Sequence, residues 1–415
     1  MYGHTASVGK PLTVRNANYK ADIQYATSIS KYILISIGIW PAVSQGVGRF
    51  LPTLLFVLCN LAMCFTIIPC VLYVIYDDAD VILKVKVSGA LSFAITACFK
   101  HFALAFRRSA IVQCMKQVEE DWKLVECRLD RETMLKHGRV GRNLTIICAS
   151  FMYCGGLIYD AFMPVMVNEN NHFNDYNRTT RHLVYPSYGG FFESQKSPVF
   201  QLVYAVHVLC EYIMFSATAG GCTLAAIFVT HTCGQIEIMV SRLKDLVDGE
   251  IFKDSSNVSV RFKIIVQRHL RVLGFASTTG RILQEVCLVE FLDSIFMICL
   301  LEYYCIVDWK AGNIKGLVAY ILLLISVSFN IFIFCHIGEL LMEKVQNYIR
   351  EACYVIDWYR LPIETSRGFI LMMAMSCNPA KISAGGMVNL SIPTFGNVLK
   401  TSLVYLNFIQ TVVFG

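Results

Sequence analysis

The chain has 415 residues, of which 55% are hydrophobic and 16% are charged, and its mean hydropathy is +0.53. Soluble domains carry about 25% charged residues, so this composition excludes a set of soluble domains and predicts a polytopic, all-α membrane protein. The net charge of +6 does not by itself indicate nucleic-acid binding, because the basic residues follow the predicted membrane topology.

The first 20 residues of the N-terminal segment (residues 1–49) read "MYGHTASVGKPLTVRNANYK". These 20 residues contain no apolar stretch. A cleaved signal peptide is therefore not expected, and the first membrane span must act as the insertion signal. Residues 1–49 are predicted to form a cytosolic N-terminal segment.

Seven segments are long and apolar enough to be transmembrane helices, which need about 20 apolar residues. The last segment is short, but a helix rises about 1.5 Å per residue, so this segment is long enough to cross most of the hydrocarbon core. Six spans fall within residues 50–338 and the seventh lies at the end of the chain. The predicted spans are 50–76, 81–99, 143–167, 199–229, 283–307, 317–338 and 400–414.

The basic residues set the orientation. Of the 36 Lys and Arg residues, 29 lie in the N-terminal segment and in alternate loops, and 7 lie in the other loops. The positive-inside rule then places the N-terminus in the cytosol and, after seven spans, the C-terminus outside. This orientation is opposite to that of a G-protein-coupled receptor. Among four Asn-x-Ser/Thr matches only Asn177 falls on the outer side, so it is the predicted glycosylation site.

Several cytosolic segments have the apolar spacing of amphipathic helices. Residues 232–282 contain two such helices, which continue spans 4 and 5 into the cytosol. Residues 339–378 are predicted to form a cytosolic assembly helix, with 355–376 burying one face in an intracellular bundle. A helix on the membrane surface is the alternative for this segment. Residues 379–415 then form a turn, opened by Pro379, and a seventh membrane helix.

The C-terminal region carries a long motif, "LMMAMSCNPAKISAGGMVNLSIPTFGNVLKTSLVY" (371–405), preceded by Tyr354, Asp357, Trp358 and Pro362. Two further segments upstream support the same resemblance: "HTCGQIEIMVSRL" (231–243) and "FIFCHIGELL" (332–341). In these residues the chain resembles the insect odorant receptor family. The short loop near 248–257 resembles that of a ligand-tuning subunit, because the co-receptor of the family has a long insertion there.

The resemblance implies an inverted seven-helix fold and a four-subunit, odorant-gated cation channel in the plasma membrane of a sensory neuron dendrite. It implies a heteromer with the odorant receptor co-receptor, a small volatile hydrophobic ligand, and a pore lined by the last helix of each subunit. Tyr354, Trp358 and Pro379 are then assembly residues. A gustatory-type receptor channel of the same superfamily and an orphan transporter are the alternatives. "VYLNFIQTV" (404–412) departs from the gustatory pattern, and no repeat between the two halves supports a transporter.

An odorant needs a dry cavity with a few polar groups. By the resemblance, spans 2, 3, 4 and 6 frame such a cavity in the outer half of the bundle. Aromatic residues at helical spacing also serve simple packing, and Glu211 has the alternative of pairing with a neighbouring helix. The candidate lining residues are Val85, Gly89, Phe93, Tyr153, Leu157, Phe162, Tyr204, His207, Glu211, Tyr212, Tyr320 and Leu324.

The last helix carries polar side chains in a span whose only charged residue is Lys400. Polar groups are unfavourable against lipid, and an aqueous pore satisfies them; hydrogen bonds between helices are the alternative. The candidate pore residues are Val404, Asn407, Phe408, Gln410 and Thr411.

Catalysis has little support in the sequence. Motifs such as HExxH, the P-loop and the nucleophile elbow are absent from it. We therefore expect no enzyme activity, no metal site and no cofactor.

Overall fold

A computed structural model describes residues 16–40, 50–77, 81–125, 127–170, 183, 185–186, 197–248, 258–377 and 381–414. The predicted residues Asn177 and Pro379 lie outside these ranges, as do the side chains of Leu157 and Phe162. Those four predictions are not addressed by the structure.

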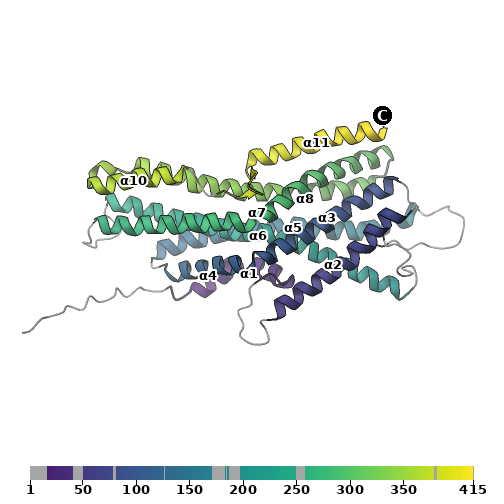
Figure 1. Cartoon of the computed structure of the whole chain (residues 1–415), viewed down its shortest axis with the longest axis horizontal. Helices are drawn as coiled ribbons and strands as arrows, with labels where there is room; N and C mark the ends of the chain where they lie inside the picture. Colours follow the sequence, from purple (N-terminus) through teal and green to yellow (C-terminus); the bar gives the residue numbers. More distant parts are fainter. Residues whose placement is uncertain are drawn as a thin grey trace, which may run out of the picture.

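The described chain is built almost entirely from helices that lie side by side along one long axis, with α10 at one end of the molecule and α2 and α11 at the other (Figure 1). The helices are α1 (Tyr19–Ser36), α2 (Leu51–Tyr76), α3 (Val81–Phe106), α4 (Arg108–Lys123), α5 (Arg128–Asn170), α6 (Val199–Asp248), α7 (Val258–Lys310), α8 (Ile314–Met342), α9 (Ile349–Val355), α10 (Ile363–Ser376) and α11 (Ile392–Phe414).

The seven predicted spans correspond to α2, α3, α5, α6, α7, α8 and α11. Except for α2, the observed helices are longer than the predicted spans. α5, α6 and α7 have 43, 50 and 53 residues, well beyond the roughly 20 that cross a bilayer. The amphipathic segments of residues 232–282 are therefore continuous with their membrane helices, as predicted.

Helix α6 forms the centre of the molecule. In its most apolar 18-residue window 94% of the residues are buried, against 28% for α2. An apolar helix whose whole circumference is buried is a core helix, and one with an exposed apolar face borders lipid. Helices α1, α2, α3, α5, α7, α8 and α9 contact α6, and α11 packs on α7 and α8. α2 lies at the periphery (Figure 1).

The longest parts of α5, α6 and α7 that lie beyond the predicted spans are residues 128–142, 230–248 and 258–282. These helix extensions form a second bundle with α1 and α4, which ion pairs stabilise. Arg131 on α5 binds Asp22 on α1 at 2.8 Å with two nitrogens. These hydrogen bonds hold the pKa of the Asp22 carboxyl below its usual value. Trp122 of α4 is almost fully buried in the same bundle, so both apolar and ionic contacts fix these helices.

Residues 355–376 do not form one helix, and this part of the prediction is wrong. α9 ends at Val355, residues Trp358–Arg360 form a 3-10 turn, and α10 begins at Ile363. α9 ends because Ile356 is extended, with ψ 138°. Pro362 keeps the chain out of the α conformation just before α10, since the residue before proline is disfavoured in that conformation; Leu361 is extended, with φ −95° and ψ 157°. Within this connection Arg360 forms an ion pair with Asp357 at 3.6 Å.

A short connecting hairpin, residues 381–391, links α10 to α11. Its strands β1 (Ser383–Ala384) and β2 (Val388–Asn389) are antiparallel, with Ser383 opposite Asn389. Gly385 and Gly386 make the turn with φ of 60° and 76°, a conformation that glycine adopts without strain. The Gly385 amide donates to the Gln284 carbonyl of α7 at 3.1 Å, which docks the hairpin on that helix.

Candidate functional site

A partly open cavity of about 100 Å³ lies among the parts of the helices that fall within the predicted membrane spans. Helices α3, α5, α6, α7 and α8 all contribute to its wall, together with Tyr185 from the segment between α5 and α6. Most of the lining is apolar or aromatic. The lining residues are Lys86, Gly89, Ala90, Phe93, Met152, Gly156, Tyr185, Glu211, Phe215, Met297, Leu301, Tyr304, Tyr320, Leu323, Ser326 and Val327.

Four of the predicted pocket residues line this cavity: Gly89, Phe93, Glu211 and Tyr320. They come from three helices, α3, α6 and α8, that the prediction had placed around it. Glu211 is 5% exposed and Tyr320 is also 5% exposed. The structure therefore brings together the predicted acidic group, the predicted glycine and two predicted aromatic rings.

The other described pocket candidates lie near the cavity without lining it. The carbonyl of Val85 accepts a bond from Tyr304, and Leu324 packs into a neighbouring apolar cluster. The remaining four candidates, Tyr153, Tyr204, His207 and Tyr212, make aromatic-ring contacts, and Tyr153 also makes a hydrogen bond. Tyr153 bonds Ser216 at 2.7 Å and stacks on Tyr212, Tyr204 stacks on Phe200, and His207 meets the edge of Tyr185.

Sequence reasoning missed the contribution of α7, whose Met297, Leu301 and Tyr304 face the cavity. The signal that could have found them is the i, i+4, i+7 spacing of these three residues on one side of a membrane helix. Ser326 and Lys86 were also missed, because a serine and a lysine in or beside an apolar run are more often explained by interface or backbone contacts.

Glycines let the wall helices approach closely at two places. A Cβ on Gly155 would lie 2.8 Å from the Ser326 Oγ, and one on Gly89 would lie 3.3 Å from the Tyr304 hydroxyl. The Ser326 hydroxyl consequently reaches across to donate to the Phe151 carbonyl at 2.7 Å. The Tyr304 hydroxyl donates to the Val85 carbonyl, also at 2.7 Å. Both bonds tie helices together at the cavity wall.

A buried ion cluster lies about two helical turns from the cavity along α3. Lys100 is 0% exposed, and its ammonium is 2.6 Å from Glu290 and 3.2 Å from Asp293 of α7. Asn330 of α8 donates to Glu290 at 2.5 Å. The predicted second span ends at residue 99, just before Lys100, whereas α3 continues to Phe106. Two carboxylates within the bundle compensate the charge of Lys100.

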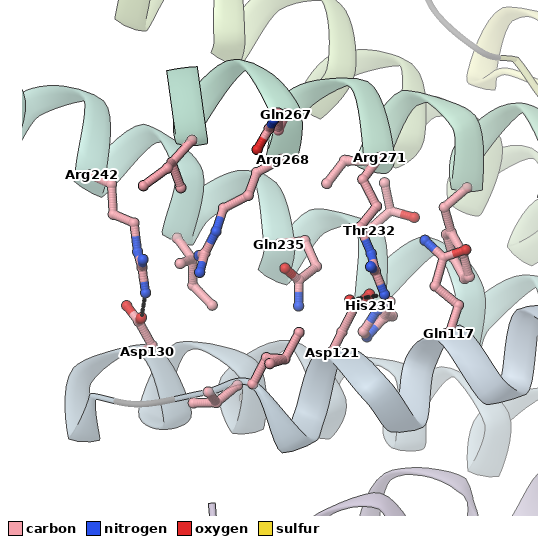
Figure 2. Close-up of a pocket in the computed structure, with 16 residues that line it drawn as sticks. Gln117, Asp121, Asp130, His231, Thr232, Gln235, Arg242, Gln267, Arg268 and Arg271 are labelled. Carbon is pink, nitrogen blue, oxygen red and sulfur yellow. Dashed lines mark hydrogen bonds and ion pairs between the residues drawn. The ribbon is translucent and has the colours of Figure 1, made fainter. Parts of the chain in front are cut away.

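A second, larger cavity of about 240 Å³ lies among the helix extensions α4, α5, α6 and α7 (Figure 2). Its wall is polar. Arg242 binds Asp130 at 2.6 Å at one end, and Arg271 binds Asp121 at 2.9 Å at the other. Small organic ligands bind in apolar cavities with few polar groups, so the smaller cavity is the candidate ligand site. At the larger cavity, ion pairs connect the surrounding helices.

Helix α11 has one packed face and one exposed face. Ser402 and Leu406 are buried against α7 and α8. Val404, Asn407, Phe408 and Thr411 are exposed, and Gln410 is half-buried. Four of the five predicted pore residues thus share the face that points away from the chain's own bundle. Tyr354, in the last turn of α9, is 78% exposed, and Trp358, between α9 and α10, is 43% exposed.

Comparison with known proteins identifies relatives of one kind. A sequence-family profile described as "7tm Odorant receptor" matches residues 81–403. "Odorant receptor 10" of Aedes albopictus is 24% identical over 226 residues, or 53% of this chain and 58% of that protein. "Odorant receptor 13a" of Drosophila melanogaster is 24% identical over 255 residues, or 55% of this chain and 60% of that protein. The chain therefore spans less than two thirds of the length of these relatives.

A solved structure has the same fold. The insect olfactory receptor OR5 from Machilis hrabei superimposes with a TM-score of 0.74 at 13% identity, covering 95% of this chain and 100% of that chain. The same receptor in complex with eugenol gives a TM-score of 0.72 at 12% identity, with the same coverage of both chains. At these identities the likeness shows the fold alone.

Proposed function

The chain belongs to the insect odorant receptor family, and from this premise we propose that it is an odorant-tuned subunit of a ligand-gated cation channel. As a member it is a multi-pass membrane receptor with seven transmembrane helices in the inverted orientation, and it is not an enzyme. The cytosolic end is therefore the bundle of helix extensions, and the apolar cavity lies in the outer half.

The observation that carries the proposal is the apolar cavity. It is lined by five helices and presents only a few polar groups, which is the usual composition of a site for a small organic ligand. The olfactory receptor of the same fold has been solved with the small odorant eugenol. Among the predicted pocket residues, Gly89, Phe93, Glu211 and Tyr320 are those that contribute to the proposed odorant site.

The proposed partner is the odorant receptor co-receptor. A co-receptor of Aedes aegypti is 28% identical to this chain over 159 residues, so the two kinds of chain share ancestry and can share an assembly geometry. The exposed apolar residues around the α9–α10 turn, Tyr354, Trp358 and Ile363, offer a surface for a neighbouring subunit. Burial of this surface would remove apolar area from water.

Whole-cell currents test the function. Cells expressing this chain with the co-receptor are expected to carry cation currents when a panel of volatile organic compounds is applied. Cells expressing either chain alone provide the control, and a C-terminal epitope tag that stains unpermeabilised cells verifies surface delivery in the predicted orientation. A heteromer present at the surface that gives no current to any compound would contradict the proposal.

Pore-facing substitutions are expected to change permeation. Asn407 and Gln410 lie on or beside the exposed face of α11, so Asn407→Asp or Gln410→Glu would place a carboxylate in the proposed pore. An added negative charge favours cations there by Coulomb attraction. We expect an altered bi-ionic reversal potential or unitary conductance, and not a complete loss, because co-receptor helices also line the pore.

The matched control for these substitutions is Gln201→Glu, which adds the same charge at an exposed position near the start of α6. This variant is expected to leave permeation unchanged. If the α11 variants reach the surface and conduct with the selectivity and conductance of the unmodified channel, the exposed face of α11 does not line the pore.

A further inference from the structure

We propose that the ring of Phe215 sets the size limit of the ligand, and that Gly156 on α5 is the seat that keeps this ring from filling the apolar cavity. The inference rests on the proposed function of the cavity as the odorant site. It goes beyond that function because it identifies two residues that determine how large an odorant the chain accepts.

The Phe215 ring lies directly on the backbone of α5 at Gly156. A Cβ on Gly156 would overlap the Cε2 and Cζ atoms at the far end of this ring and would lie 3.0 Å from its Cδ2 atom. Contacts between carbon atoms have their optimum at about 3.5–4.0 Å. A residue larger than glycine therefore does not fit at position 156 while the ring keeps its place.

Two aromatic neighbours flank the ring. The Phe93 ring of α3 is tilted against it with 5.6 Å between the ring centres, and the Tyr153 ring of α5 meets it edge to face at 6.5 Å. Both distances fall in the range of about 4.5–7 Å in which aromatic pairs attract each other. Tyr153 is itself fixed, because its hydroxyl makes a hydrogen bond with Ser216 at 2.7 Å and its ring stacks on Tyr212.

The cavity borders the Phe215 ring as well, since Gly156, Phe215 and Phe93 all line it. Protein interiors are close-packed, so a ring displaced from Gly156 cannot move into the space of Phe93 or Tyr153. It would turn about its side-chain bonds into the cavity. Seated on Gly156 the ring is a wall of the cavity, and unseated it would occupy the place of the ligand.

The volume of the cavity shows how small the ligand must be. An apolar cavity of about 150 Å³ holds benzene, and this one has about 100 Å³. Compounds with about six non-hydrogen atoms or fewer therefore fit without a rearrangement of the wall. Removing the Phe215 ring would extend the cavity to the backbone of α5, because Gly156 has no side chain that could fill the space.

A different lining side chain is the alternative size limit. Met297 and Leu301 border the cavity from α7. Methionine is flexible and adapts its shape to its surroundings, whereas the Phe215 ring is rigid and is fixed by Gly156, Phe93 and Tyr153. If an α7 side chain sets the limit, truncation of Phe215 would leave the preferred ligand size unchanged.

The experiment measures the preferred ligand size on the heteromer of this chain with the co-receptor. The probes are the straight-chain methyl ketones from 2-butanone to 2-decanone, together with every compound of the odorant panel that activates the channel. For the unmodified chain the lowest EC50 is expected at about six non-hydrogen atoms, which corresponds to 2-pentanone among the ketones. Longer ketones are expected to have higher EC50 values.

Phe215→Ala is expected to shift the optimum to ketones at least about two carbons longer, because truncation of a packed ring leaves a cavity. The EC50 of these longer ketones should fall about fourfold for each additional methylene that becomes buried. Phe215→Leu removes less volume and should give a smaller shift in the same direction. The matched control is Phe200→Ala, which removes a ring from α6 at a position that does not line the cavity and should leave the optimum unchanged.

Gly156→Ala tests the seat of the ring. It is expected to raise the EC50 of every active compound at least about fivefold, because the displaced ring overpacks the cavity. The double variant Gly156→Ala/Phe215→Ala should behave like Phe215→Ala alone, since the added methyl group then has no ring to displace; such non-additivity is typical of residues in contact. Gly274→Ala, with nothing within 4 Å of its Cβ, is the control, and surface staining and melting temperature verify the folding of each variant.

The outcomes separate this inference from the proposed function. An unmodified chain that responds best to the longest ketones, or an optimum that Phe215→Ala and Phe215→Leu leave unchanged, would overturn the inference and leave the odorant-receptor function intact. An effect of Gly156→Ala that persists in the double variant would do the same, because it would not depend on the ring. Surface-expressed heteromers that respond to no ketone and to no compound of the odorant panel would overturn both the function and the inference.

Discussion

Replacing Lys100 by Met is expected to prevent the chain from folding stably and from reaching the cell surface. The ammonium of Lys100 is fully buried and is the cation that neutralises Glu290 and Asp293, at 2.6 and 3.2 Å. Without it, two carboxylates remain close together in the membrane interior. Removing one partner of a buried ion pair costs about 3–5 kcal/mol, a large part of a typical folding free energy.

The measurement is surface staining together with the melting temperature of the detergent-solubilised protein. Lys116→Met, on an exposed position of α4, removes the same charge and is expected to change neither quantity. The triple variant Lys100→Met/Glu290→Gln/Asp293→Asn should recover much of the loss, since neutral amides are cheaper to bury than unpaired carboxylates. Normal surface staining and melting of Lys100→Met alone would show that the cluster is not needed for the fold.

The Lys100 cluster also shows where sequence reasoning about the fold ends. Apolar length identified all seven membrane helices, because the hydrocarbon core sets the length of a span. It stopped the second span at residue 99, since a lysine normally ends an apolar run. α3 continues to Phe106, and the reason lies on α7, nearly two hundred residues further along the chain, where Glu290 and Asp293 meet the ammonium.

Four of the five helices that line the candidate pocket were predicted, α7 being the exception, but fewer of the lining residues were. Gly89, Phe93, Glu211 and Tyr320 line the cavity, whereas Tyr204 and Tyr212 on the same helix as Glu211 do not. The sequence does not determine the rotation of a helix that is apolar on all sides, such as α6. The wall formed by Tyr304 follows from a glycine, Gly89, that lets α7 approach α3, and this contact has no signature in local sequence.

For the segment before α11, the sequence predicted helix followed by a turn. It did not predict the break between α9 and α10 or the hairpin that forms the turn. Extended backbone at Ile356 and Leu361 divides the segment, and the connecting hairpin then docks on α7 and α8. Two glycines make that docking possible. A Cβ on Gly338 of α8 would collide with the carbonyl of Leu390, and one on Gly280 of α7 would lie 2.6 Å from the carbonyl oxygen of Lys381. Both contacts are with backbone, which cannot move aside as a side chain can.

Gly280→Ala is therefore expected to displace the connecting hairpin and impair the channel. Overpacking of this kind costs roughly 1–3 kcal/mol, and the displaced residues join directly to the helix proposed to line the pore. Gly274→Ala provides an unusually close control, because Gly274 lies on the same helix and nothing stands within 4 Å of the position of its Cβ. In an exposed helical site, alanine in place of glycine stabilises by roughly 0.5–1 kcal/mol.

The same glycine-to-alanine substitution at two positions six residues apart on α7 should thus change the melting temperature in opposite directions. Gly274→Ala should raise the melting temperature slightly and leave the maximal current unchanged. Gly280→Ala should lower the melting temperature and reduce the maximal agonist current per channel at the surface, because the hairpin sets the position at which α11 starts. Equal melting temperatures and equal currents for the two variants would show that the docking of the hairpin on α7 does not position α11.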